Sequence, residues 1–130
     1  MSESSAAVTD GGDAIVVLIT AASREEADRI ARRLVDDRLA ACVNIMPHVR
    51  SLFVWEGKLS QEDEVLLVAK SRRGRFPQLT AVVKQLHSYS VPEIIALPIV
   101  TGSSAYLNWM REETRSPQRT TGEQGALTRS

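Results

Sequence analysis

The sequence predicts an α+β domain whose elements follow the order β-α-β-β-α-β, with one further helix at the C-terminal end. Three observations predict it: a continuous apolar segment at 14–19, two helical stretches with apolar stripes, and an unusually long apolar strand that returns after a turn. A chain of 130 residues accommodates one domain and leaves little room for a second. We expect that domain to span 14–115, between disordered polar tails at 1–13 and 116–130.

The apolar segment AIVVLI at 14–19 predicts a central strand that is covered on both faces. Ser23 and Glu26 then fit a capping box, in which the serine side chain accepts a hydrogen bond from a free backbone N–H. The apolar positions that follow recur at helical spacing: Ala27, Ile30, Ala31, Leu34 and Val35. The sequence therefore predicts a first helix from Ser23 to about Arg38.

The longest predicted strand runs from about Ala41 to Trp55, turns at 56–58 and returns as a second long strand over 59–71. Proline cannot donate to a strand ladder, so Pro47 within the first arm indicates a bulge or an edge position. Both arms exceed the about five or six residues of a typical strand. The sequence therefore predicts a long hairpin.

The outer part of this hairpin is apolar at four successive positions, 52–55, so neither of its faces is polar there. Left bare, such a ribbon would promote aggregation. We expect another copy of the chain to cover it. The alternative is that the last helix, through Tyr106 and Trp109, folds over the hairpin within one subunit.

Pro77 marks the start of a second helix, where a missing N–H costs nothing. Its apolar stripe consists of Phe76, Leu79, Val82, Val83 and Leu86. The segment 93–101 reads as the fourth strand, with Pro98 indicating an edge, and Ser103 or Ser104 can cap a last helix. Together the elements give a split βαβ, or ferredoxin-like, arrangement, whose usual strand order 4-1-3-2 places the fourth strand at an edge.

The charge balance argues against a nucleic-acid or membrane partner, because sixteen basic and sixteen acidic residues cancel. The basic segment Lys70–Arg75 fits a solvated strand end that discourages edge pairing. No apolar stretch approaches the ~18 residues of a membrane span, and residues 1–13 lack the features of a secretory signal. The single cysteine, Cys42, suits a reducing compartment, so we expect a cytoplasmic protein.

Five segments, taken together, resemble the CutA family of divalent-cation tolerance proteins: RLAACVNIMP, SLFVWEGKL, EVLLVAKS, HSYSVPEIIALPI and YLNW. The resemblance extends from about Ile15 to about Trp109. It implies a ferredoxin-like fold and a homotrimer built from long hairpins, an outline shared with the PII signal-transduction proteins. It also implies a role in the response to metal ions, chiefly copper.

The resemblance implies copper binding through Cys42, because the cysteine of this motif has been implicated in copper binding in the family. A lone strand cysteine is otherwise a small buried hydrophobe. His87, which we expect in a partly exposed loop, is the second candidate ligand, or else a histidine that the dipole favours at a helix C-terminus. The family more often has proline where this chain has Ser88, and some members have a second cysteine where it has Ile19. With few soft ligands and no CxxC-type spacing, we expect no tightly bound cofactor and only weak binding of copper or another divalent cation.

The resemblance implies that several members of a third group of residues line a cleft between subunits: Trp55, Glu56, Lys58, Lys70, Tyr89 and Glu93. Aromatic walls with a lysine and a carboxylate favour a small anionic or zwitterionic ligand. The alternative is a network of structural ion pairs at the interface. The first interpretation describes a PII-like sensor of a small ligand, and the second a structural or scaffolding trimer without metal dependence.

We expect no enzymatic activity. Cys42 lies within a strand rather than at a helix N-terminus, which is where reactive thiols are commonly activated. The sequence also shows no nucleophile elbow and no glycine-rich phosphate loop.

Overall fold

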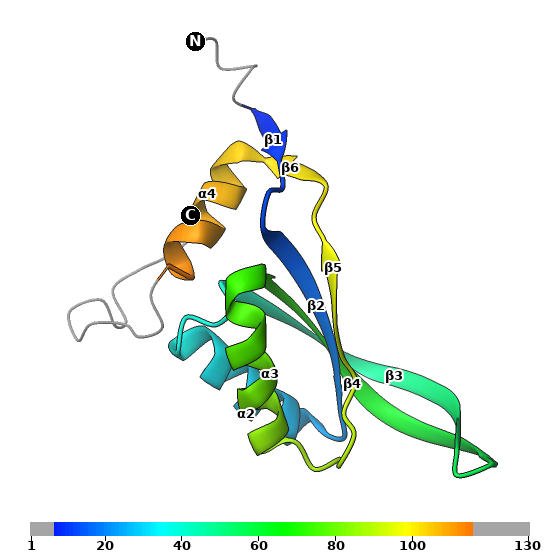
Figure 1. Cartoon of the computed structure of the whole chain (residues 1–130). Helices are drawn as coiled ribbons and strands as arrows, with labels where there is room; N and C mark the ends of the chain where they lie inside the picture. The colour runs from blue at the N-terminus through cyan, green and yellow to red at the C-terminus, as the bar shows by residue number, and fades with distance from the viewer. Residues whose placement is uncertain (1–6, 116–130) are drawn as a thin grey trace.

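The computed structural model describes residues 7–115, and the remaining residues, including the whole predicted C-terminal tail, lie outside this range. Its elements in chain order are β1 (Val8–Asp10), β2 (Ala14–Ala21), α2 (Arg24–Asp36), β3 (Cys42–Trp55), β4 (Lys58–Arg72), the 3₁₀ helix η1 (Arg73–Arg75), α3 (Phe76–Leu86), β5 (Ile94–Pro98), β6 (Thr101–Ser103) and α4 (Ser104–Glu113) (Figure 1). The predicted order is confirmed, and the short strands β1 and β6 are additions. Within residues 7–115, none of the helices has the length and hydrophobicity that a membrane span requires.

The main sheet has four strands in the order β3-β4-β2-β5, and every neighbouring pair is antiparallel. This is the ferredoxin-like order that the sequence predicts. The fourth core strand, β5, lies at an edge and ends at Pro98, which pairs with Ile15. The edge position explains why proline is tolerated there, since its missing N–H breaks no central ladder.

Helices α2 and α3 lie together on one side of the sheet (Figure 1). The predicted cap of α2 is confirmed, because Ser23 Oγ accepts a hydrogen bond of 3.1 Å from the backbone N–H of Glu26. The main core lies between these helices and the sheet, and its fully buried members include Val17, Ile19, Ile30, Leu34, Leu67, Leu79 and Val83. Burying side chains of this size contributes about 1.5–3 kcal/mol each, which makes this layer the main source of stability.

The opposite, helix-free face of the sheet is also apolar but only partly covered. Successive strand residues alternate between faces, so Leu18 and Val68 point away from α2 and α3. Their neighbours Ile95 and Leu97 on β5 are 49% and 48% exposed. A single chain therefore leaves apolar surface in contact with water along this face.

A β-bulge divides β3 at the position where Pro47 predicts it. Met46 pairs with Leu66, but the next pair in the ladder is Val49 with Glu64, so β3 uses one residue more than β4. His48 has a positive φ of 68°, a conformation that ordinary side chains rarely adopt. The bulge predicted from Pro47 is therefore confirmed.

The extra residue decides which side chains the hairpin presents to each face. Residues paired across antiparallel strands share a face. Before the bulge, the even-numbered residues of β3, such as Met46, lie on the helix-free face. After the bulge, the odd-numbered residues lie on that face. Phe53 and Trp55 consequently extend the helix-free face onto the hairpin.

The prediction of a disordered tail over 1–13 is wrong for residues 8–10. They form β1, which pairs with β6 from Val8↔Ser103 to Asp10↔Thr101. The reason is a partner distant in sequence, which the polar composition of the tail does not reveal. The tight approach of Gly11 to Ile99 holds the connection to β2, because a Cβ at Gly11 would lie 1.6 Å from the Ile99 carbonyl oxygen.

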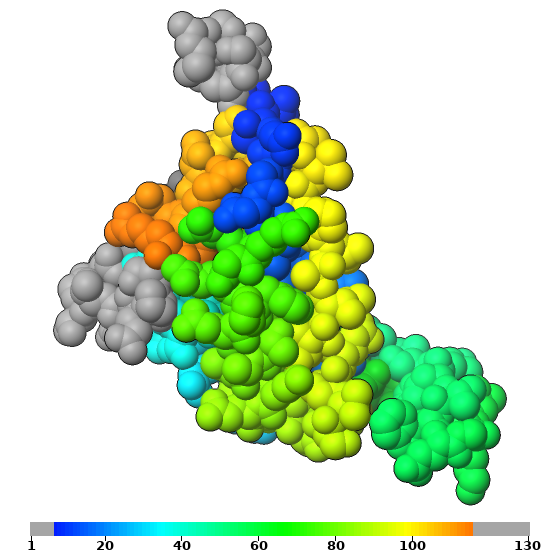
Figure 2. All heavy atoms as spheres, viewed as in Figure 1, coloured from blue at the N-terminus to red at the C-terminus, as the bar shows by residue number. Residues whose placement is uncertain are grey.

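Helix α4 packs at the end of the sheet and not over the hairpin, so the alternative of an intrasubunit cover is wrong. Its buried residues Leu107 and Met110 form a second small core with Ala14 and Ala41. The end of the hairpin stands clear of the body in Figure 2. Its apolar side chains are exposed: Leu52 56%, Phe53 37%, Val54 67%, Trp55 51% and Leu59 74%.

Candidate functional site

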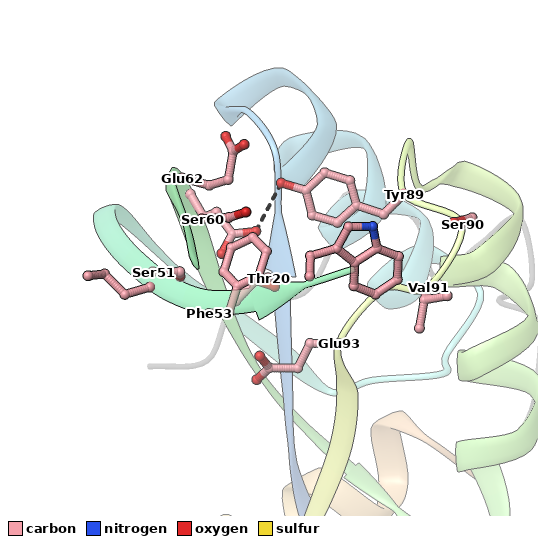
Figure 3. Close-up of a pocket in the computed structure, with 12 residues that line it drawn as sticks. Thr20, Ser51, Phe53, Ser60, Glu62, Tyr89, Ser90, Val91 and Glu93 are labelled. Carbon is pink, nitrogen blue, oxygen red and sulfur yellow. Dashed lines mark hydrogen bonds between the residues drawn. The ribbon is translucent and has the colours of Figure 1, made fainter. Parts of the chain in front are cut away.

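A cavity of about 630 Å³ opens between the hairpin and the loop that leads into β5. Its apolar lining consists of Leu52, Phe53, Trp55 and Val91, and its polar lining of Thr20, Ser51, Ser60, Glu62, Glu64, Tyr89, Ser90 and Glu93 (Figure 3). The bulge creates the hairpin wall, because it places Phe53 opposite Ser60 and Ser51 opposite Glu62 on the same face. Two distant segments of the chain therefore enclose one site.

Tyr89 connects these two segments. Its hydroxyl donates a hydrogen bond of 3.0 Å to Oε2 of Glu64, a residue that is only 7% exposed (Figure 3). Burial, and after it the hydrogen bond to Glu64 and the negative charges of Glu64, Glu62 and Glu26, raise the pKa of Tyr89 to about 12. The phenol therefore keeps its proton at neutral pH and remains a donor.

His87 anchors the same loop, and its side chain is 0% exposed. Its Nδ1 accepts a hydrogen bond of 3.0 Å from the backbone N–H of Tyr89. The ring proton is then on Nε2, which donates to the carbonyl oxygen of Thr20 at 2.6 Å. Both ring nitrogens are engaged within the chain, which argues against His87 as a metal ligand. The alternative is right in position, since His87 is the C-cap of α3.

Glu26 completes this buried junction. Its carboxylate accepts hydrogen bonds from the backbone N–H groups of Ala22 at 3.1 Å and Ser88 at 3.0 Å, and lies 3.6 Å from Nδ1 of His87. Burial pushes the pKa of Glu26 upward, but its hydrogen bonds with Ala22 and Ser88 outweigh burial and lower the pKa below its ordinary value. The bond from Ser88 depends on this chain's departure from the family pattern, because proline has no N–H to donate.

Cys42 is half-buried on the helix-free face and does not meet His87 within the chain. It pairs with Lys70, which pairs in turn with Val16, whereas His87 binds the carbonyl of Thr20. Four residues along β2 correspond to roughly 13 Å. Among the residues that the structure describes, no three His, Cys, Asp or Glu side chains are grouped closely enough to hold a metal ion.

The predicted cleft residues lie at three separate places in the chain. Trp55, Tyr89 and Glu93 line the cavity. Glu56 and Lys58 are exposed in and beside the hairpin turn, outside the cavity lining. Lys70 lies with Cys42 and donates a hydrogen bond to Oδ1 of Asn44. Within a single chain, the cavity lining therefore includes neither Lys58 nor Lys70.

Sequence reasoning missed the carboxylates of Glu62 and Glu64. A signal was present, because acidic residues are depleted in strand interiors and QEDE at 61–64 lies inside a long predicted strand. Their convergence on Tyr89 was not visible, since it depends on the path of a loop far away in the sequence.

The order of strands, the projecting hairpin and the buried junction at the end of α3 define a ferredoxin-like α+β protein with a candidate small-ligand site. The chain belongs to the CutA1 divalent ion tolerance protein family, whose model matches residues 15–113.

Relatives with known names agree with this membership. The divalent-cation tolerance protein CutA of Thermus thermophilus is 52% identical over 99 residues, which are 76% of this chain and 96% of the relative. The chloroplastic protein CutA of Arabidopsis thaliana is 45% identical over 78% of the chain, and human protein CutA is 40% identical over 81%. The chain spans 56% and 59% of the length of these two longer relatives.

Solved structures of the family have the same fold. The Thermus thermophilus divalent cation tolerance protein superposes with a TM-score of 0.77 at 50% identity, covering 78% of this chain and 98% of that one. CutA1 of Oryza sativa also gives 0.77, at 44% identity, and covers 78% and 94%.

Proposed function

We propose that the chain functions as a homotrimer in which neighbouring copies cover the helix-free face and the hairpin. The apolar surface that one chain leaves exposed carries this proposal, from Leu97 on β5 to Leu59 on the hairpin. Large exposed apolar patches mark interfaces, because burying them in an assembly lowers the free energy. Closed symmetry also protects strand edges from open-ended pairing. The number of three copies comes from the family resemblance.

In this proposal the trimer acts in the tolerance of divalent cations, the property that the printed names of its bacterial relatives state for those proteins. Copper contacts it weakly through Cys42, whose thiolate is a soft ligand. Cys42 lies on the face where copies would meet, two residues from Asn44 and four from Met46, whose thioether is also soft. The ammonium group of Lys70, on the neighbouring strand, repels a cation and keeps the affinity low.

A copper titration of the full chain tests the metal proposal. Cys42→Ser should abolish copper uptake and leave the assembly intact, whereas His87→Gln should leave uptake unchanged, since neither ring nitrogen of His87 is available. Met46→Leu, a substitution of similar volume, separates the thioether from the thiolate. Unchanged copper uptake in Cys42→Ser would refute the metal site.

A second candidate function is the sensing of a small ligand in the manner of PII proteins. The cavity beside Tyr89 favours it, because a concave site of about 630 Å³ is within the usual range for small-molecule sites. A structural trimer without metal dependence is the remaining alternative. It would bind neither copper nor a small ligand.

Our proposal includes no catalysis and places the chain in the cytoplasm. Cys42 is a strand residue with a lysine opposite, and the nitrogens of His87 are held by backbone groups, so the two do not form a nucleophile and base. The single cysteine supports a reducing compartment. Subcellular fractionation of cells that express a tagged form of the chain would test the location.

A further inference from the structure

Within a single chain, the cavity beside Tyr89 carries charge of one sign only. Three carboxylates, those of Glu62, Glu64 and Glu93, line it, and no lysine, arginine or histidine does so. None of the three forms an ion pair with another residue in the described part of the chain. A site with this lining repels anions and attracts cations.

The raised pKa of Tyr89 also supports the conclusion that the cavity attracts cations. Burial contributes most to the shift, but Glu64 and Glu62 add to it because a phenolate would stand among their negative charges. The same potential that opposes a phenolate would favour an ammonium group.

The distribution of the carboxylates indicates an extended ligand rather than a single metal ion. In Figure 3 the carboxylates of Glu62 and Glu93 lie on opposite sides of the Tyr89 hydroxyl. Acidic side chains within the described residues are nowhere grouped closely enough for three of them to share one ion. A ligand that meets both carboxylates would therefore carry its charged groups apart along its length.

The walls between the carboxylates are suited to an apolar chain that carries positive charge. Phe53 and Trp55 contribute aromatic surface that remains 37% and 51% exposed in the chain. Aromatic faces attract cations and also bury methylene groups. Hydroxyl groups of Ser60 and Ser90 can accept hydrogen bonds from ammonium N–H donors.

We propose that this cavity stays open between the assembled copies and binds an elongated organic polycation of the aliphatic diamine or polyamine class, with ammonium groups at Glu93 and at Glu62 and Glu64 and its methylene chain against Phe53 and Trp55. This inference rests on the second candidate function, small-ligand sensing, and specifies the ligand class. It is independent of copper binding at Cys42.

Three probes with a six-carbon chain test the proposal on the assembled full-length protein by titration calorimetry. We expect hexane-1,6-diamine to bind once per chain, at least about tenfold more tightly than hexane-1,6-diol and than adipate, and to weaken with added salt. Glu93→Gln should weaken diamine binding about tenfold or more, because it removes one charge without shortening the side chain. Glu25→Gln, at an exposed carboxylate on α2 outside the cavity, is the matched control and should change nothing.

Each other outcome overturns the proposal in a distinguishable way. Diol binding as tight as diamine binding would show an apolar groove, and tighter adipate binding would show a cationic one; in both cases a small-ligand site survives and the ligand class is wrong. If none of the three probes binds, the ligand site itself fails, as it would if a cationic side chain of a neighbouring copy filled the cavity. Copper uptake, measured on the same samples with Cys42→Ser, reports separately on the metal proposal.

Discussion

The hydroxyl of Tyr89 donates to the buried carboxylate of Glu64 at 3.0 Å, and this contact joins the loop before β5 to the hairpin. Tyr89→Phe removes the donor and leaves the carboxylate of Glu64, a residue only 7% exposed, with one partner fewer. We expect a loss of about 1–2 kcal/mol in the free energy of unfolding, measured with urea at pH 7. Ser90→Ala, at an exposed position in the same loop, is the control. Equal stability of Tyr89→Phe and the parent would show that this bond does not hold the loop.

The carboxylate of Glu26 makes stability dependent on pH. Its pKa in the folded chain lies below the ordinary value of 4.5, so the unfolded chain binds the proton more readily. The stabilising contribution is therefore fully present above pH 4.5 and is lost as the pH falls through the lowered pKa. Glu26→Gln should be less stable than the parent at pH 7, and the gap should narrow below pH 4.5 in urea titrations. A gap that stays constant down to acid denaturation would contradict the assignment.

The backbone N–H of Ser88 is one source of the lowered pKa of Glu26. Ser88→Pro removes this donor, so the pKa of Glu26, followed by carboxyl NMR, should rise toward its ordinary value. Ser88→Ala keeps the backbone donor and removes only the hydrogen bond of the Ser88 side chain to Glu26, so the pKa of Glu26 should rise less. An equal pKa in the two variants would show that the N–H of residue 88 has no effect.

The close approach of Gly11 to Ile99 predicts a specific intolerance. Gly11→Ala would place Cβ 1.6 Å from a carbonyl oxygen, which forces the backbone apart and costs about 1–3 kcal/mol. Gly74→Ala is the matched control, because a Cβ at Gly74 meets nothing within 4 Å. Thermal unfolding of both variants measures the difference. A Gly11→Ala protein as stable as Gly74→Ala would mean that the β1–β2 connection is not packed as described.

Local chemistry allowed much of the fold to be predicted from the sequence. A serine before a helix can accept a hydrogen bond from a free backbone N–H, as Ser23 does. A proline has no backbone N–H to donate, which predicts the bulge at Pro47 and the edge strand that ends at Pro98. The predicted tail was wrong at 8–10 because β1 depends on a partner about ninety residues away, at Thr101–Ser103.

The candidate site was predictable only in part for the same reason. The sequence predicts Trp55, Tyr89 and Glu93, which line the cavity, but it does not predict the negative charge of the lining. That charge comes from Glu62 and Glu64, whose position in the cavity depends on the bulge in β3 and on the path of the loop before β5. The burial of His87 depends likewise on Thr20, a neighbour in space and not in sequence.

Native mass spectrometry of the full-length chain, with and without a small excess of copper, tests the central claim that copies of the chain cover the helix-free face. We predict a species of three times the chain mass of 14.3 kDa, which persists in Cys42→Ser and gains copper only in the parent. Ile95→Asp, which puts a charge on that face at a position 49% exposed in the single chain, should shift the mass toward the monomer. A parent protein that runs as a monomer at micromolar concentration would contradict the claim.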